Sequence, residues 1–165
     1  MSKPVCLVTG PVATRSGYGA HARDIARSLI DLDKFDVKIW NVRWGNTPMN
    51  ALNDMEPRDK ILIDRLLQNP QLPSQPDIHV HVVIPNEFSP IGKYNIGVTA
   101  GLECTAVPPS WLEGMNRMDM NIVPSKFVKN TFENVKFDIQ DEKTGQLKGT
   151  VANNKKIEVL FEGAD

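Results

Sequence analysis

The sequence alternates short apolar runs with stretches of helical periodicity along most of its length. The apolar runs have the length of β-strands, and the stretches between them repeat apolar residues at the spacing of one helix face. Parallel strands need crossover connections, which are usually helices, so this alternation predicts a parallel sheet covered by helices. The expected fold is a Rossmann-like α/β domain with three layers (α/β/α) and a mainly parallel sheet.

Gly, Pro and Asn residues, which favour turns and loops, mark the expected ends of the helices and strands. The predicted strands are residues 4–9, 35–42, 77–84, 95–100, 120–123 and 156–161. The predicted helices are residues 20–30, 57–68, 108–118 and 126–135, and Ser125 is expected to be the N-cap of the last one. A Lys143-Thr144-Gly145 turn between alternating residues further predicts a β-hairpin inserted near residues 138–151.

Length and composition indicate one globular domain, residues 1–165. The hydrophobic content of 41% and charged content of 24% are ordinary for a soluble protein. The formal net charge of −1 gives no reason to expect nucleic acid or an anionic membrane as the main partner. The apolar start is too short for a signal peptide or a membrane span, and the two cysteines lack metal or redox spacing. A cytoplasmic location is therefore expected.

The segment between the first strand and the first helix, residues 10–19, is rich in glycine. In an open α/β sheet this turn lies at the carboxyl end of a strand and is the usual anion site. The helix start offers N–H groups, glycines admit a ligand to the backbone, and Arg15 adds positive charge. The candidate binding residues here are Gly10, Arg15, Ser16, Gly17, Tyr18 and Gly19. The alternative is a tight turn in which the glycines serve geometry alone.

This loop is neither a dinucleotide fingerprint nor a P-loop. No G-x-G-x-x-G is present, and no Lys-Ser/Thr pair follows the last glycine. The acid that binds ribose in NAD-dependent enzymes is also missing, since Asn41 and Arg43 occupy the end of the second strand. A nicotinamide- or ATP-dependent Rossmann enzyme stays an alternative, but these departures disfavour it.

Two histidines and one carboxylate are further candidates. His79 and His81 lie two apart on a strand and face the same side, but without a third ligand at suitable spacing no metal site is expected. His81, nearer the carboxyl end, is a candidate contact at the cleft rim, with buried packing as the alternative. Glu103 follows the fourth strand and is the candidate catalytic residue, with a solvated loop carboxylate as the alternative.

Several of these stretches together resemble a known family. They are Ser16-Gly17-Tyr18-Gly19, Glu103-Cys104-Thr105-Ala106-Val107-Pro108-Pro109-Ser110-Trp111, Asn116-Arg117-Met118-Asp119 and Val123-Pro124-Ser125-Lys126-Phe127. In this order they resemble the N-terminal domain of family 4-like glycosyltransferases with the two-domain GT-B fold. The tail, residues 158–165, resembles the segment that leaves this domain for the hinge.

The resemblance implies that the chain binds a glycosyl acceptor and lines the cleft for the diphosphate of a nucleotide-sugar donor, such as a UDP- or GDP-sugar. Family members need no essential metal. Ser125 and Lys126 join the candidate binding residues through their place in the matching stretch. Many members carry a histidine just after the fourth strand, where this chain has Ala100-Gly101-Leu102, so Glu103 is the substitute candidate for a base or orienting group.

The resemblance also implies a partner. In the family a C-terminal domain holds the donor through a pair of glutamates, and the 165 residues contain no counterpart of it. A hexosyltransferase domain that cannot complete transfer alone is therefore expected. The alternative is a stand-alone sugar- or nucleotide-binding module without catalysis.

Overall fold

The predicted alternation produces a six-stranded, mostly parallel sheet with the strand order β2-β1-β3-β4-β5-β8, flanked by helices, and a separate sheet of β6 and β7. The computed structural model describes residues 2–102 and 104–163. The strands of the large sheet are β1 Val5–Gly10, β2 Asp36–Asn41, β3 Ile78–Val82, β4 Tyr94–Val98, β5 Met120–Val123 and β8 Lys156–Val159. The expected Rossmann-like fold class is confirmed.

The helices fall between the strands as expected. They are α1 Gly17–Asp31, α2 Pro57–Ile63, the 3₁₀ turn η1 Pro85–Glu87, α3 Pro109–Arg117 and α4 Lys126–Asn134. Within the described part of the chain, none of these helices is long and apolar enough to cross a bilayer.

The internal contacts divide the chain into two compact units. The first contains the residues up to Val83 together with Pro90–Ile96, and the second contains Ile84–Ser89 and the residues from Gly97 onward. Strand β4 passes from one unit to the other, so the division does not follow a linker.

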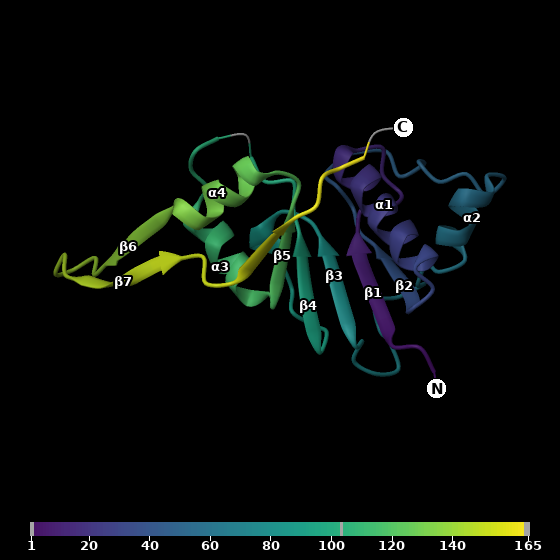
Figure 1. Cartoon of the computed structure of the whole chain (residues 1–165), viewed down its shortest axis with the longest axis horizontal. Helices are drawn as coiled ribbons and strands as arrows, with labels where there is room; N and C mark the ends of the chain where they lie inside the picture. The colour runs from purple at the N-terminus through teal and green to yellow at the C-terminus, as the bar shows by residue number, and fades with distance from the viewer. Residues whose placement is uncertain (1, 103, 164–165) are drawn as a thin grey trace. The chain divides into compact units, whose positions relative to one another are not determined.

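In the first unit, β1 lies between β2 and β3 and pairs with both in parallel (Figure 1). Val8 in the middle of β1 is fully buried and pairs with Ile39 on one side and Val80 on the other. At the end of β1, a Cβ on Gly10 would lie 3.1 Å from the Cβ atoms of both Ala22 and Val82. Glycine therefore lets α1 pack closely over the carboxyl end of this strand.

The second helix is shorter than predicted, because the sheet competes for its backbone. The predicted helix 57–68 ends at Ile63. Beyond it, the Ile39 amide donates to the Arg65 carbonyl at 2.9 Å, and the Leu67 amide donates to the Ile39 carbonyl at 2.9 Å. These residues satisfy their backbone groups against β2 instead of continuing the helix.

The second unit contains parallel strands β5 and β8 with helices α3 and α4. Helix α3 approaches η1 so closely that a Cβ on Gly114 would lie 1.8 Å from the Pro85 carbonyl oxygen. Asn121 in β5 is buried, and its side-chain amide donates to the Met115 carbonyl at 3.0 Å. This bond ties the end of α3 to the sheet.

The expected hairpin is present in this unit. Strands β6 Lys136–Gln140 and β7 Leu147–Ala152 pair antiparallel, with Phe137 opposite Val151. Asn116 of α3 fixes the end of β7, because the Asn116 side-chain nitrogen donates to the Ala152 carbonyl at 2.8 Å. The insertion predicted near residues 138–151 is thereby confirmed.

Candidate functional site

The β1–α1 loop, residues 11–16, lies at the carboxyl end of β1 and is folded onto itself by hydroxyl groups. The Thr14 hydroxyl donates to the Pro11 carbonyl at 2.8 Å and lies 2.8 Å from the Ser16 hydroxyl oxygen. That oxygen accepts a hydrogen bond from the Gly19 amide at 2.9 Å, which makes Ser16 the N-cap of α1. Because of this cap the helix begins at Gly17, earlier than the predicted start at Ala20.

Arg23 on α1 forms two hydrogen bonds to the backbone of this loop. One guanidinium nitrogen, Nη1, donates to the carbonyls of Val12 at 2.8 Å and of Thr14 at 2.9 Å. Burial lowers the pKa of Arg23, and the nearby Arg27 lowers it further, but an arginine remains protonated in proteins. The guanidinium thus turns two electronegative carbonyl oxygens toward itself. Arg23 was not among the residues expected from the sequence, because its only signal is its position about two helical turns after Ser16.

The loop amides are largely satisfied within the protein. The Ala13 amide donates to the Asn41 side chain at 2.9 Å, and the Arg15 amide donates to the Pro48 carbonyl at 3.0 Å. The Val12 amide donates to the Gly10 carbonyl at 2.9 Å. In the first turn of α1, the Gly19 amide is already bonded to the Ser16 hydroxyl. An anion would therefore meet the amide of Gly17 at the start of the helix and not those of the loop itself.

The two candidate glycines of this first turn have different environments. A Cβ on Gly19 would lie 2.3 Å from the Thr14 carbonyl oxygen, so this glycine is required for packing of the loop on the helix. Gly17 is exposed, and nothing lies within 4 Å of the place a Cβ would occupy. Neither residue has a positive φ. The geometric interpretation thus accounts for Gly19, and Gly17 is the one that a ligand can approach.

The segment between β2 and α2, residues 42–56, here called the strap, lies against this loop. Arg15 donates from Nε to the Asn50 side chain at 2.9 Å, and the Ala51 amide donates to the Ala13 carbonyl at 3.0 Å. The rings of Tyr18 and Trp44 stack with centroids 4.3 Å apart and planes inclined by 27°. Backbone, polar and aromatic contacts thus join the strap to the candidate residues.

A buried ion pair fixes the far end of the strap. Asp59 is 9% exposed, and its carboxylate accepts from Arg27 Nη2 at 2.5 Å and from the Asn53 amide at 3.0 Å. A carboxylate that is buried and paired in this way is costly to displace, because removing either partner leaves an uncompensated charge. The strap is therefore anchored to both α1 and α2.

The histidines of β3 are buried. His79 lies 2.9 Å from the Thr9 hydroxyl through Nε2, and His81 is 7% exposed. Burial lowers the pKa of His81 to about 3, with a smaller contribution from the charge of His79, so the His81 ring is neutral at physiological pH. This placement favours packing over ligand contact for His81. Among the described residues, no three His, Cys, Asp or Glu side chains are grouped to hold a metal ion.

A hollow of about 640 Å³ lies in the second unit. Its lining follows the carboxyl ends of three strands: Ala100 and Gly101 after β4, Pro124, Ser125, Phe127 and Val128 after β5, and Glu162 after β8. Ligands in open α/β sheets bind at this edge, and the volume lies within the usual range for small-molecule sites. Ser125 was a candidate from its sequence, whereas Phe127, which is 51% exposed at the hollow, was not.

Two local features shape this hollow. The Ser125 hydroxyl oxygen accepts from the Val128 amide at 3.1 Å, so its predicted role as N-cap of α4 is confirmed. Gly101 has a φ of +72°, and a Cβ there would lie 2.4 Å from Val128 Cγ1. Lys126, the first residue of α4, is exposed beside Ser125. Glu103, the candidate catalytic residue, lies outside the described residues.

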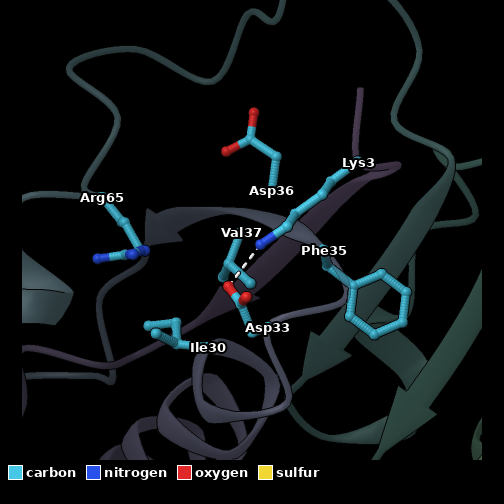
Figure 2. A pocket seen from close by; sticks show the side chains of 7 residues that line it. All are labelled: Lys3, Ile30, Asp33, Phe35, Asp36, Val37 and Arg65. Carbon is cyan, nitrogen blue, oxygen red and sulfur yellow. Dashed lines mark hydrogen bonds and ion pairs between the residues drawn. The ribbon is translucent and has the colours of Figure 1, made fainter. Parts of the chain in front are cut away.

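Another hollow, of about 360 Å³, lies in the first unit at the amino-terminal ends of its strands. Figure 2 shows Lys3, from the segment before β1, reaching Asp33 beyond the end of α1, where the two form an ion pair. Asp36 and Val37 at the start of β2 also line it. Because this is the amino-terminal edge of β1 and β2, it is separate from the candidate site.

Comparison with known proteins identifies no relative. No protein-family model, curated protein or solved structure matches this chain. A functional assignment therefore rests on the chemistry of the two carboxyl-edge regions and on the motif resemblance.

The glycines of the first helical turn give a test of the loop's construction. Gly19→Ala should lower the free energy of unfolding by about 1–3 kcal/mol, because the new Cβ overlaps the Thr14 carbonyl. Gly17→Ala should keep or slightly raise the stability, since the site is open and alanine favours a helix. Urea unfolding of both variants measures this. Equal stability of the two variants would contradict the described loop.

His81 gives a pH test. A neutral His81 whose pKa is lowered in the folded state takes up fewer protons than its unfolded counterpart, so stability should fall as the pH drops from about 6.5 toward 3. The loss of folding free energy that is due to His81 should reach about 2 kcal/mol by pH 5. NMR titration should show the His81 ring neutral down to pH 5, and His81→Gln should flatten the pH dependence. Protonation of His81 near pH 6.5 would contradict its burial, and His21→Gln controls for the loss of a histidine.

Proposed function

We propose that this chain is the acceptor-side, N-terminal domain of a GT-B-type glycosyltransferase, taking part in hexosyl transfer from a nucleotide sugar. The observation that carries the proposal is the exposed first turn of α1, where Gly17 leaves the backbone open above a loop whose carbonyls are turned toward Arg23. This arrangement supports a diphosphate at the carboxyl end of β1, where the motif resemblance expects the donor to approach.

The chemistry of this region suits a diphosphate. The amide of Gly17 and the positive end of the helix dipole favour an anion. Arg15 is exposed and donates from Nε and Nη2 to Asn50, which engages two of the five donors of a guanidinium. Its remaining donors can reach phosphate oxygens while Asn50 fixes the direction of the side chain. Arg15 thus acts as an oriented cation rather than a free surface charge.

The hollow of the second unit is the proposed place for part of the acceptor. Ser125 uses its oxygen to cap α4, which leaves its proton for a ligand oxygen. Phe127 offers an apolar wall, and Glu162 adds a carboxylate to the lining. Glu103 is proposed as the base or orienting group for the acceptor hydroxyl, and Lys126 as a further contact. A C-terminal domain that grips the nucleotide sugar is the proposed partner.

Nucleotide binding tests the proposal. The chain should bind UDP, GDP or their sugars weakly, near the millimolar range that corresponds to about 4 kcal/mol, with the largest amide NMR shifts at Gly17. Gly17→Val should weaken this binding at least about tenfold, because the branched side chain fills the space that the phosphate needs. Gly149→Val, at an equally open glycine of the hairpin, is the matched control.

Sugar transfer should require an added C-terminal donor-binding domain. Steady transfer by residues 1–165 alone would contradict the proposed division of labour. Preferential micromolar binding of NAD or ATP would favour the other Rossmann type. Binding of a nucleotide sugar without transfer in the presence of the C-terminal domain would favour a non-catalytic binding module.

A further inference from the structure

The aromatic pair of Tyr18 and Trp44 has no role in the diphosphate site as proposed. Tyr18 belongs to the first turn of α1, next to the exposed Gly17, and Trp44 comes from the strap. Both side chains are partly exposed, although a Trp and a Tyr in a domain of this size can be buried in the core. The pair therefore keeps aromatic surface in contact with solvent beside the candidate anion site.

The strap does not depend on this aromatic pair for its position. Arg15 donates to Asn50, Ala51 donates to Ala13, and Asp59 accepts from Asn53. A stacked aromatic pair adds only about 0.5–1.5 kcal/mol beyond its buried area. At the other end of the strap, the Val42 amide donates to the Gly10 carbonyl at 3.1 Å. Since polar contacts thus hold both ends of the strap, the stacking mainly fixes the orientation of the Trp44 ring. A ring that is oriented before binding loses less entropy when a ligand packs on it.

The surroundings of Trp44 define the ligand chemistry. An indole face packs well on the C–H face of a pyranose ring, and the hydroxyl groups at the edge of that ring need hydrogen-bond partners. Asn50, on the same strap as Trp44, is held by Arg15 and supplies an exposed amide group. An apolar platform with a few oriented polar groups is typical of a small-molecule site.

We propose that Trp44, oriented by Tyr18, is the surface on which this chain stacks the pyranose ring of its acceptor and is therefore a specificity-determining residue. The inference rests on the proposed glycosyltransferase function and narrows the acceptor to a glycoside. The ring on Trp44 is then one sugar unit of the acceptor, distinct from the part proposed for the hollow of the second unit, and it lies beside the first turn of α1.

Titration of the full chain with a panel of methyl pyranosides (glucoside, galactoside, mannoside and N-acetylglucosaminide) tests this. The indole N–H resonance of Trp44 should shift with at least one glycoside, while those of Trp40 and Trp111 should not. Trp44→Ala should weaken that binding at least tenfold, and Trp44→Phe should stay within about threefold of the parent. Trp40→Phe, on β2, is the matched control and should leave binding unchanged.

The outcomes separate this inference from the proposed function. No shift of Trp44 with any glycoside would overturn the inference, as would unaltered binding by a folded Trp44→Ala variant. A shift of Trp44 with uridine or guanosine in place of glycosides would also overturn it, because the ring would then stack a base. UDP shifts at Gly17 report on the proposed function independently, so loss of one signal with retention of the other identifies which proposal fails.

Discussion

The guanidinium of Arg23 is the interaction on which the candidate site depends. By donating hydrogen bonds to the carbonyls of Val12 and Thr14, it fixes the path of the chain between β1 and α1. Ser16 can then cap the helix and Gly19 can pack beneath the Thr14 carbonyl. Gly17, at the start of α1, stays exposed beside this fixed loop. The proposed anion site would therefore depend on a cation that the anion does not touch.

The strap extends this arrangement to the side chains that are proposed to contact a ligand. Its anchor is the pair of Arg27 and Asp59, which is largely buried and also binds the backbone of Asn53. Buried pairs contribute little net stability compared with apolar packing, but breaking one is costly. The pair therefore fixes one conformation of the strap, which places Asn50 against Arg15 and Trp44 against Tyr18.

Signals that act locally were readable from the sequence. The alternation of periodicities gave the parallel sheet, the turn at Lys143 gave the hairpin, and the hydroxyl of Ser125 gave the cap of α4. Each depends on residues close in sequence. The end of α2 was not readable, because it is set by pairing with Ile39 of β2. Arg23 was likewise missed, since a polar residue on a helix face does not reveal which carbonyls it will meet.

The candidate residues show the same contrast between local signals in the sequence and contacts that depend on the whole fold. Ser16 and Gly17 became candidates because a strand–glycine–helix sequence marks the carboxyl edge of a sheet, whereas no such local signal surrounds Trp44. Its pairing with Tyr18 joins residues from two different connections. His81 was placed near the rim by its position in the strand, but the packing over β3 leaves it 7% exposed. Burial of this kind is a property of the whole fold.

Amide hydrogen exchange of an Arg23→Gln variant tests the central claim most directly, with Arg58→Gln on the exposed face of α2 as the control. If Arg23 organises the loop, exchange at Ala13, Thr14 and Arg15 should accelerate at least about tenfold while Val80 in β3 keeps its protection, and the UDP-induced shift at Gly17 should be lost. Unchanged protection of the loop together with unchanged UDP binding would contradict the account.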